Sequence, residues 1–142
     1  MNLEKEMIMK QFLKVLAAAA VIGIVMSCST GYTASEGDIL EKYLEPESLL
    51  VLTQNPDPAI WIIDVRPGGA YDNGHIPTAK SFPSGEIMDR LEELPQTQYL
   101  IFYCETGGRA QMVIDKLEPR GYTRMLNWGG YTRWPYDLVT GD

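Results

Sequence analysis

Apolar residues gather in short uninterrupted runs that predict buried β-strands. The two clearest runs cover residues 59–65 and 99–103, and two short strands of mixed character are predicted over residues 79–82 and 123–126. A strand covered on both faces is apolar at every position and does not alternate. The four segments are therefore predicted to be the strands of one sheet, and the two apolar runs are predicted to be its buried strands.

Helical patterns fill the gaps between these runs. Residues 46–53 begin with Pro46 at a first-turn position, and residues 84–94 and 109–119 carry apolar residues at helical spacing. A short C-terminal helix is expected after residues 127–130. Strands that alternate with helices predict an α/β domain with a mainly parallel central sheet and helices on both faces.

Composition limits what this domain does. The chain of 142 residues is long enough for one hydrophobic core, and its 45% apolar and 22% charged residues are ordinary for a globular protein. With 12 Lys plus Arg against 19 Asp plus Glu, the net charge is -7. Such a surface repels phosphate backbones, which excludes nucleic-acid binding as a leading function.

The N-terminus has the layout of an export signal. Lys10 and Lys14 precede the apolar residues 15–26, a run shorter than the roughly 20 residues of a membrane-spanning helix. Its end, Val-Met-Ser-Cys, resembles the bacterial lipobox, which predicts a signal peptide over residues 1–27, cleavage before Cys28 and a lipid on Cys28. A conventional cleaved signal and an uncleaved anchor remain alternatives.

The leader also bears on the start of translation and on location. Glu4 and Glu6 are unusual in a basic leader, so Met7 or Met9 is an alternative start to Met1. Residues 28–37 are small and polar, as expected of a flexible tether to a domain over residues 38–142. We expect a lipid-anchored protein facing the periplasm. The residue after Cys28 is not Asp, which favours the outer membrane over the inner one.

Cys104 is the leading candidate for chemistry. It follows the apolar run 99–103 and precedes a Gly-containing loop that opens into a helix. Backbone N–H groups at such a turn stabilise a thiolate, and parallel sheets collect chemistry at the carboxyl ends of their strands. The alternative is an inert buried Cys that packs as a small hydrophobe.

Four stretches of the chain resemble motifs of the rhodanese sulfurtransferase family. They are Ile-Asp-Val-Arg at 63–66, Gly-His-Ile-Pro-Thr-Ala at 74–79, Cys-Glu-Thr-Gly-Gly-Arg at 104–109 and Trp-Gly-Gly-Tyr-Thr-Arg-Trp at 128–134. The second departs from the usual pattern, with Thr78 where Gly is common. The resemblance covers residues 40–137 and implies a single rhodanese-like domain.

The resemblance also implies a reaction. Cys104 takes a sulfane sulfur from a donor such as thiosulfate, and a thiol or cyanide removes it from the resulting persulfide. It implies no cofactor and no metal site, and we expect a monomer. The substrate-binding candidates are the loop residues Glu105, Thr106, Gly107, Gly108 and Arg109.

Two charged loop residues pull in opposite directions. Arg109 supports a thiolate and an anionic donor if its guanidinium faces the loop, and is otherwise a solvated first-turn residue. Glu105 raises the thiol pKa and repels thiosulfate if it points inward, and matters little if it points outward.

Residues outside the loop are candidates for supporting roles. Asp64 and Arg66 are expected to form a polar clamp near the loop. His75, the only histidine, is expected to make a structural hydrogen bond, with general-base catalysis as the alternative. Trp128 is expected to be a core aromatic residue that walls one side of the pocket.

Two other functions compete with sulfur transfer. A phosphatase of the related dual-specificity type has a Cys-x5-Arg loop sized for phosphate, whereas here four residues separate Cys104 from Arg109. The shorter loop favours a single sulfur atom. A non-catalytic module that holds a persulfide or binds a partner is the second alternative.

Overall fold

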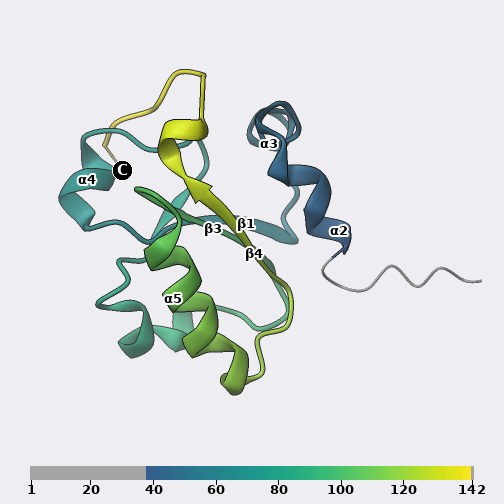
Figure 1. Ribbon diagram of the computed structural model, residues 1–142, viewed down its shortest axis with the longest axis vertical. Coiled ribbons are helices and arrows are strands. Elements are labelled where there is room, and N and C mark those ends of the chain that lie inside the picture. Colours follow the sequence, from purple (N-terminus) through teal and green to yellow (C-terminus); the bar gives the residue numbers. More distant parts are fainter. Residues whose placement is uncertain (1–37, 142) are drawn as a thin grey trace, which may run out of the picture. The chain divides into compact units, whose positions relative to one another are not determined.

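The computed structural model describes residues 38–141, and the predictions for the signal peptide, the tether and Cys28 lie outside this part. Figure 1 shows the arrangement of its elements. The helices are α2 (Asp38–Glu41), α3 (Pro46–Gln54), α4 (Gly68–Asp72) and α5 (Gly108–Leu117). The strands are β1 (Ile60–Asp64), β2 (Lys80–Ser81), β3 (Tyr99–Cys104) and β4 (Met125–Gly130). The 3-10 turns are η2 (Lys42–Leu44), η3 (Ile87–Asp89), η4 (Leu91–Glu93), η5 (Glu118–Arg120) and η6 (Tyr131–Arg133).

The four strands form one sheet in the order β2-β1-β3-β4, and every pairing is parallel. β1 and β3 occupy the centre, with Ile62 opposite Ile101. Their apolar sequences follow from this position, because both faces of a central parallel strand are covered. The predicted parallel α/β sheet is confirmed. Its strand carboxyl ends meet at one edge, where Asp64 and Cys104 both lie.

Two hydrophobic clusters pack on the two faces of the sheet. One joins Tyr103 and Trp128 to the buried side chains of α2 and α3. The other joins Phe102 and Cys104 to the buried face of α5, and Figure 1 shows α3 and α5 well separated across the strands. Successive residues of β3 thus face opposite clusters, as a strand requires. The expected helices on both faces are confirmed.

The helix predicted over residues 84–94 is wrong. This segment forms only the turns η3 and η4. Pro95 disfavours a helical conformation at Leu94, which is extended (φ -111°, ψ 91°). The two turns still bury Ile87 and Leu94 in the cluster beneath α5. The apolar spacing that indicated a helix is therefore also compatible with two 3-10 turns.

The C-terminal prediction also needs correction. Residues 127–130, expected to follow the last strand, lie inside β4, and the expected helix is the single turn η6. The pairing of β4 with β3 shifts register between Phe102 and Tyr103. Trp128 is the extra residue, because Asn127 pairs with Phe102 and Gly129 pairs with Tyr103. The shift places Gly130 opposite Cys104.

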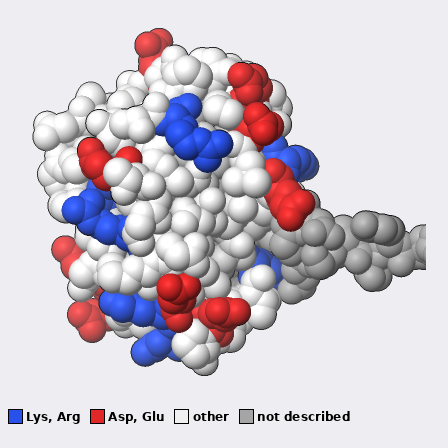
Figure 2. Space-filling view, viewed as in Figure 1, with Lys and Arg blue, Asp and Glu red and all other residues white. Residues whose placement is uncertain are grey.

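The surface of the described domain is mixed in charge. Acidic and basic side chains are interspersed over the face seen in Figure 2 rather than gathered into separate fields. Within residues 38–141, no helix combines the length and apolar character that crossing a membrane requires.

Candidate active site

Cys104 ends β3 at the carboxyl edge of the sheet and is the free cysteine of the described residues. Its side chain is 1% exposed and packs in the cluster beneath α5. The backbone N–H of Gly107 donates a hydrogen bond to its Sγ at 3.0 Å. The loop after the strand therefore turns back over the thiol.

The loop favours the ionised form of this thiol. Burial is the largest single influence and raises the pKa of Cys104, because it penalises charge. Backbone N–H groups of Ala110, Thr106, Gly107 and Arg109 act in the opposite direction and together outweigh burial. The pKa of Cys104 is consequently below its ordinary value. A lower pKa increases the fraction of Cys104 present as thiolate, which is the nucleophilic form of the side chain.

The loop side chains mostly face away from the thiol. Glu105, Thr106 and Arg109 are exposed, whereas Gly107 is buried. Within residues 38–141 the Arg109 guanidinium has no hydrogen bond or ion pair. The effect of Arg109 on the pKa of Cys104 comes from its backbone N–H. Gly107 has φ +97°, in the left-handed region that favours glycine. This conformation lets the chain turn from β3 into α5 within three residues.

The end of β4 lies directly against the loop. A Cβ added to Gly130 meets the carbonyl oxygen of Glu105 at 2.4 Å, and one added to Gly107 meets the Cα of Gly129 at 3.0 Å. Asn127 adds a hydrogen bond from its Nδ2 to the carbonyl of Gly107 at 3.1 Å. The glycines of the 128–134 motif thus allow two backbones to touch. Sequence reasoning assigned no role to Asn127.

Asp64 and Arg66 form the expected clamp beside the loop. The carboxylate accepts hydrogen bonds from the backbone N–H and the guanidinium of Arg66, the shortest at 2.6 Å from Nη2. Nη2 also donates to the carbonyl of Gly74 at 2.7 Å. Burial lowers the pKa of Arg66, but its hydrogen bonds to Asp64 and the charge of Asp64 outweigh burial and raise it. The Arg66 guanidinium therefore keeps its positive charge beside the side chain of Asp64.

Contacts with Tyr71 and Val139 hold His75 in place. Its ring stacks on Tyr71 with 3.6 Å between ring centroids, and Nδ1 lies 2.9 Å from the carbonyl of Tyr71. The side chain is 4% exposed, and its backbone pairs with Val139. This arrangement is that of a structural hydrogen-bonding residue.

The structure does not bring Trp128 to the thiol. Trp128 is fully buried in the cluster with α2 and α3, on the face of the sheet opposite to Cys104. Its Nε1 donates to the carbonyl of Tyr43 at 2.8 Å. The expected pocket wall is therefore a core residue, because alternation along β4 directs its side chain to the face that Tyr103 also faces.

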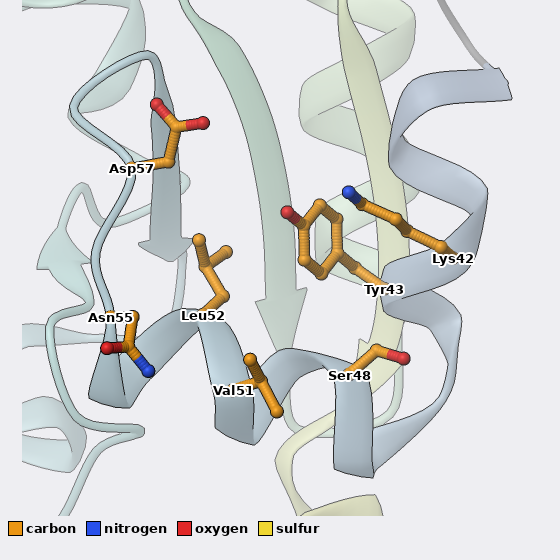
Figure 3. Close-up of a pocket in the computed structure, with 7 residues that line it drawn as sticks. All are labelled: Lys42, Tyr43, Ser48, Val51, Leu52, Asn55 and Asp57. Carbon is orange, nitrogen blue, oxygen red and sulfur yellow. The ribbon is translucent and has the colours of Figure 1, made fainter.

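A pocket of about 260 Å³ opens beside the loop. Its lining includes Glu105, Arg66 and Tyr131. The guanidinium of Arg66 lies 4.4 Å from the centroid of that ring. A separate pocket of about 350 Å³ is bordered by η2, α3 and the loop before β1, as Figure 3 shows. It shares no residue with the Cys104 loop. In residues 38–141 no group of three or more potential ligands is placed to hold a metal ion.

A buried thiol that accepts a backbone N–H at a strand end of a parallel α/β sheet, with its pKa lowered, is typical of proteins with a reactive cysteine. Residues 45–136 match the family described as rhodanese-like domain. The chain belongs to this family.

Relatives with established names agree with this family. A sulfurtransferase of Allochromatium vinosum is 32% identical over 76 residues, covering 53% of this chain and 71% of the relative. The thiosulfate sulfurtransferase GlpE of Pseudoalteromonas translucida is 27% identical over 94 residues, covering 66% of this chain and 88% of the relative. Another relative, YrkF of Bacillus subtilis, is 29% identical over 119 residues, and the match spans 64% of its length.

Solved structures show the same fold. A rhodanese-like domain protein from Staphylococcus aureus superposes with a TM-score of 0.59 at 28% identity, covering 68% of this chain and 95% of that one. A rhodanese from E. coli, solved with anions, gives a TM-score of 0.53 at 27% identity. The match covers 58% of this chain and 100% of that one. The fold is therefore the rhodanese fold.

Proposed function

We propose that this protein is a sulfurtransferase that carries a sulfane sulfur on Cys104. The observation that supports this proposal is the buried thiol whose pKa the loop N–H groups lower. The family and the sulfurtransferase names of its relatives agree with it. The donor is of the thiosulfate type, and the acceptor is cyanide or a thiol.

The two half-reactions balance without a further reactant. The thiolate of Cys104 attacks the outer sulfur of thiosulfate, a new S–S bond forms, and sulfite leaves with the electron pair of the broken S–S bond. Cyanide then attacks the outer sulfur of the persulfide and leaves as thiocyanate, which returns the thiolate. A thiol acceptor leaves as its own persulfide. Each step is a nucleophilic displacement at sulfur.

The loop supplies the stabilisation that this cycle needs. Cys104 is negatively charged before the first step, while it carries the persulfide and after the second step. Fixed N–H donors stabilise that charge without reorganising. Arg109, whose guanidinium is exposed at the start of α5, adds a positive charge that attracts an anionic donor.

Glu105 sets the limit on anionic donors. Its carboxylate is exposed, next to the thiol in sequence, and lines the pocket beside Arg66. Arg66 is already neutralised by Asp64, so the charge of Glu105 is not cancelled by that pair. We expect thiosulfate to react more slowly with this protein than with its Glu105→Gln variant, because like charges repel.

Mass spectrometry of the purified chain after thiosulfate treatment tests the proposal. We expect one added sulfur atom on Cys104, removed by cyanide and absent from Cys104→Ser. No adduct from thiosulfate or from polysulfide would leave the non-catalytic, partner-binding module as the function. Turnover of an aryl phosphate that Cys104→Ser abolishes would replace sulfur transfer with phosphatase chemistry.

We also propose that the protein works in the cell envelope as a monomer anchored by a lipid on Cys28. The basic leader, the short apolar run and the lipobox-like ending support this location. Labelling of the expressed protein with a fatty acid, lost in Cys28→Ser, is the expected result. Recovery of Cys28→Ser and the native protein in the same soluble fraction would refute the anchor. A dimer in analytical ultracentrifugation would refute the monomer.

A further inference from the structure

Asn127 connects the last strand to the Cys104 loop through its side chain. It lies in β4 opposite Phe102 and is half-buried. Its Nδ2 donates to the carbonyl of Gly107 and to Oε1 of Gln111, each at 3.1 Å. Its Oδ1 accepts the backbone N–H of Gly129 at 3.0 Å. Both ends of the amide are therefore engaged, which fixes its orientation.

Gly107 is held on both of its sides. Its N–H points at the sulfur of Cys104, at 3.0 Å. Its carbonyl points the other way, where it accepts hydrogen bonds from Asn127 and from the backbone N–H of Gln111, at 3.1 and 3.0 Å. Without a Cβ, a glycine rotates between these orientations more freely than any other residue. The first hydrogen bond of α5, donated by Gln111, and the side chain of Asn127 both favour the orientation that suits a thiolate.

We propose that Asn127 is a positioning residue that locks the Gly107–Gly108 peptide with its carbonyl turned away from Cys104. If this peptide rotated, a carbonyl oxygen with partial negative charge would approach the sulfur. The N–H groups on either side of it would lose their aim at the same time. The carboxamide of Asn127 opposes this rotation, because it gives the outward carbonyl a second donor, from β4, in addition to the backbone N–H of Gln111 in α5.

The Cys104 loop and β4 approach each other closely beside the Asn127 side chain. A Cβ on Gly107 meets the Cα of Gly129 at 3.0 Å and Oδ1 of Asn127 at 3.5 Å. The loop and β4 are thus close enough for the short Asn side chain to reach the carbonyl. Gly129 has φ +101°, and its N–H is the group that Asn127 binds. The side chain therefore couples the turn in β4 to the turn after β3.

The inference deepens the proposed function, since it concerns the same thiol, but its test does not need sulfur transfer. Iodoacetamide alkylates a thiolate directly. The dependence of its rate on pH therefore reports the ionisation of Cys104 whether or not the protein accepts sulfur. Alkylation is followed at Cys104 by mass spectrometry, which separates it from Cys28. A failed persulfide assay with a confirmed alkylation profile would refute only the proposed function.

Two substitutions of Asn127 and two of Gln111 form the experiment. Asn127→Ala removes the donor, and Asn127→Asp keeps the shape and the bond from Gly129 but places an acceptor against the Gly107 carbonyl. Gln111→Ala removes only the neighbouring contact. Gln111→Glu adds the same charge as Asn127→Asp without facing that carbonyl. Circular dichroism and thermal melting confirm that each variant is folded.

We expect the alkylation profile of both Asn127 variants to move to higher pH. The rate at pH 6 falls by about tenfold, the effect of weakening one charge-assisted hydrogen bond. Gln111→Ala and Gln111→Glu keep the native profile within about twofold. A folded Asn127→Ala with the native profile would overturn the proposal. If Asn127→Ala does not fold, a native profile of Asn127→Asp overturns it. Equal effects in the Asn127 and Gln111 variants would also overturn it.

Discussion

Gly130→Ala tests whether the shape of the Cys104 loop depends on β4. The added Cβ would lie 2.4 Å from the carbonyl oxygen of Glu105 and 3.1 Å from its carbonyl carbon. Both contacts are with backbone, which cannot rotate away as a side chain does. Gly130 itself has an ordinary extended conformation (φ -97°, ψ 142°). The expected damage is therefore steric and has no contribution from backbone strain.

The size of the effect follows from the required movement. The loop must retreat by about 1 Å to reach ordinary van der Waals contact. Overpacking of this kind costs about 1–3 kcal/mol, which lowers the melting temperature of a domain of this size by roughly 5–20 °C. A displacement of about 1 Å at a reacting group costs up to about 100-fold in rate. We expect a comparable loss in the rate at which Cys104 takes up sulfur.

Gly108→Ala is the matched control for stability. A Cβ on Gly108 meets no atom within 4 Å, and Gly108 is the first residue of α5. Alanine favours a helix over glycine by about 0.5–1 kcal/mol, so this variant should melt at the native temperature or a few degrees above it. Thermal melting measures both variants, and iodoacetamide alkylation follows the thiol. Native melting and native alkylation in Gly130→Ala would refute the reasoning.

Three further predictions follow from buried polar groups. Asp64→Ala leaves the Arg66 guanidinium, whose side chain is 4% exposed, without its partner. The free energy of unfolding, measured with urea, should fall by about 3–5 kcal/mol. A loss under about 1 kcal/mol would contradict this prediction. Tyr122→Phe removes the hydrogen bond from the hydroxyl to the carbonyl of Leu94 at 2.6 Å and should cost about 1–2 kcal/mol in the same assay, whereas an unchanged unfolding midpoint would argue against it. The pKa of Cys104 is lowered by folding, so the unfolded chain binds more protons between the folded pKa and the unfolded value of about 8.5. The free energy of unfolding should therefore gain a contribution as pH rises through that window, and lose it as pH falls through the folded pKa. Cys104→Ser should lack this contribution, and an identical pH dependence of the two proteins would exclude it.

Local sequence patterns were enough to predict most of the fold and the Cys104 loop at the centre of the site. The runs around Ile62 and Ile101 predicted central strands, because a strand buried on both faces is mostly apolar. The Cys104 loop was predictable because its donors are contributed by the six residues that follow the thiol. A short segment with glycines after a buried strand is enough to indicate that geometry.

Contacts between distant segments were not predictable in the same way. Asn127 reaches Gly107 across 20 positions of sequence, and no periodicity encodes a single side-chain hydrogen bond. The extra residue at Trp128 could not be seen either, because a register shift depends on which strand becomes the neighbour. The error over residues 84–94 has the same origin: Ile87 and Leu94 reach the core by helical spacing or by two tight turns, and only Pro95 distinguishes them.

Because β4 packs against the Cys104 loop, the reactivity of the thiol depends on how far the chain has folded. Residues 104–110 contain the thiol and the N–H donors that lower its pKa, yet residues 127–130, which are synthesised later, pack against them. A nascent or partly folded chain therefore presents Cys104 with the ordinary reactivity of an unstructured thiol. Full reactivity appears only when the last strand has docked. The alkylation rate of this one residue is consequently a direct measure of how much of the protein has completed folding.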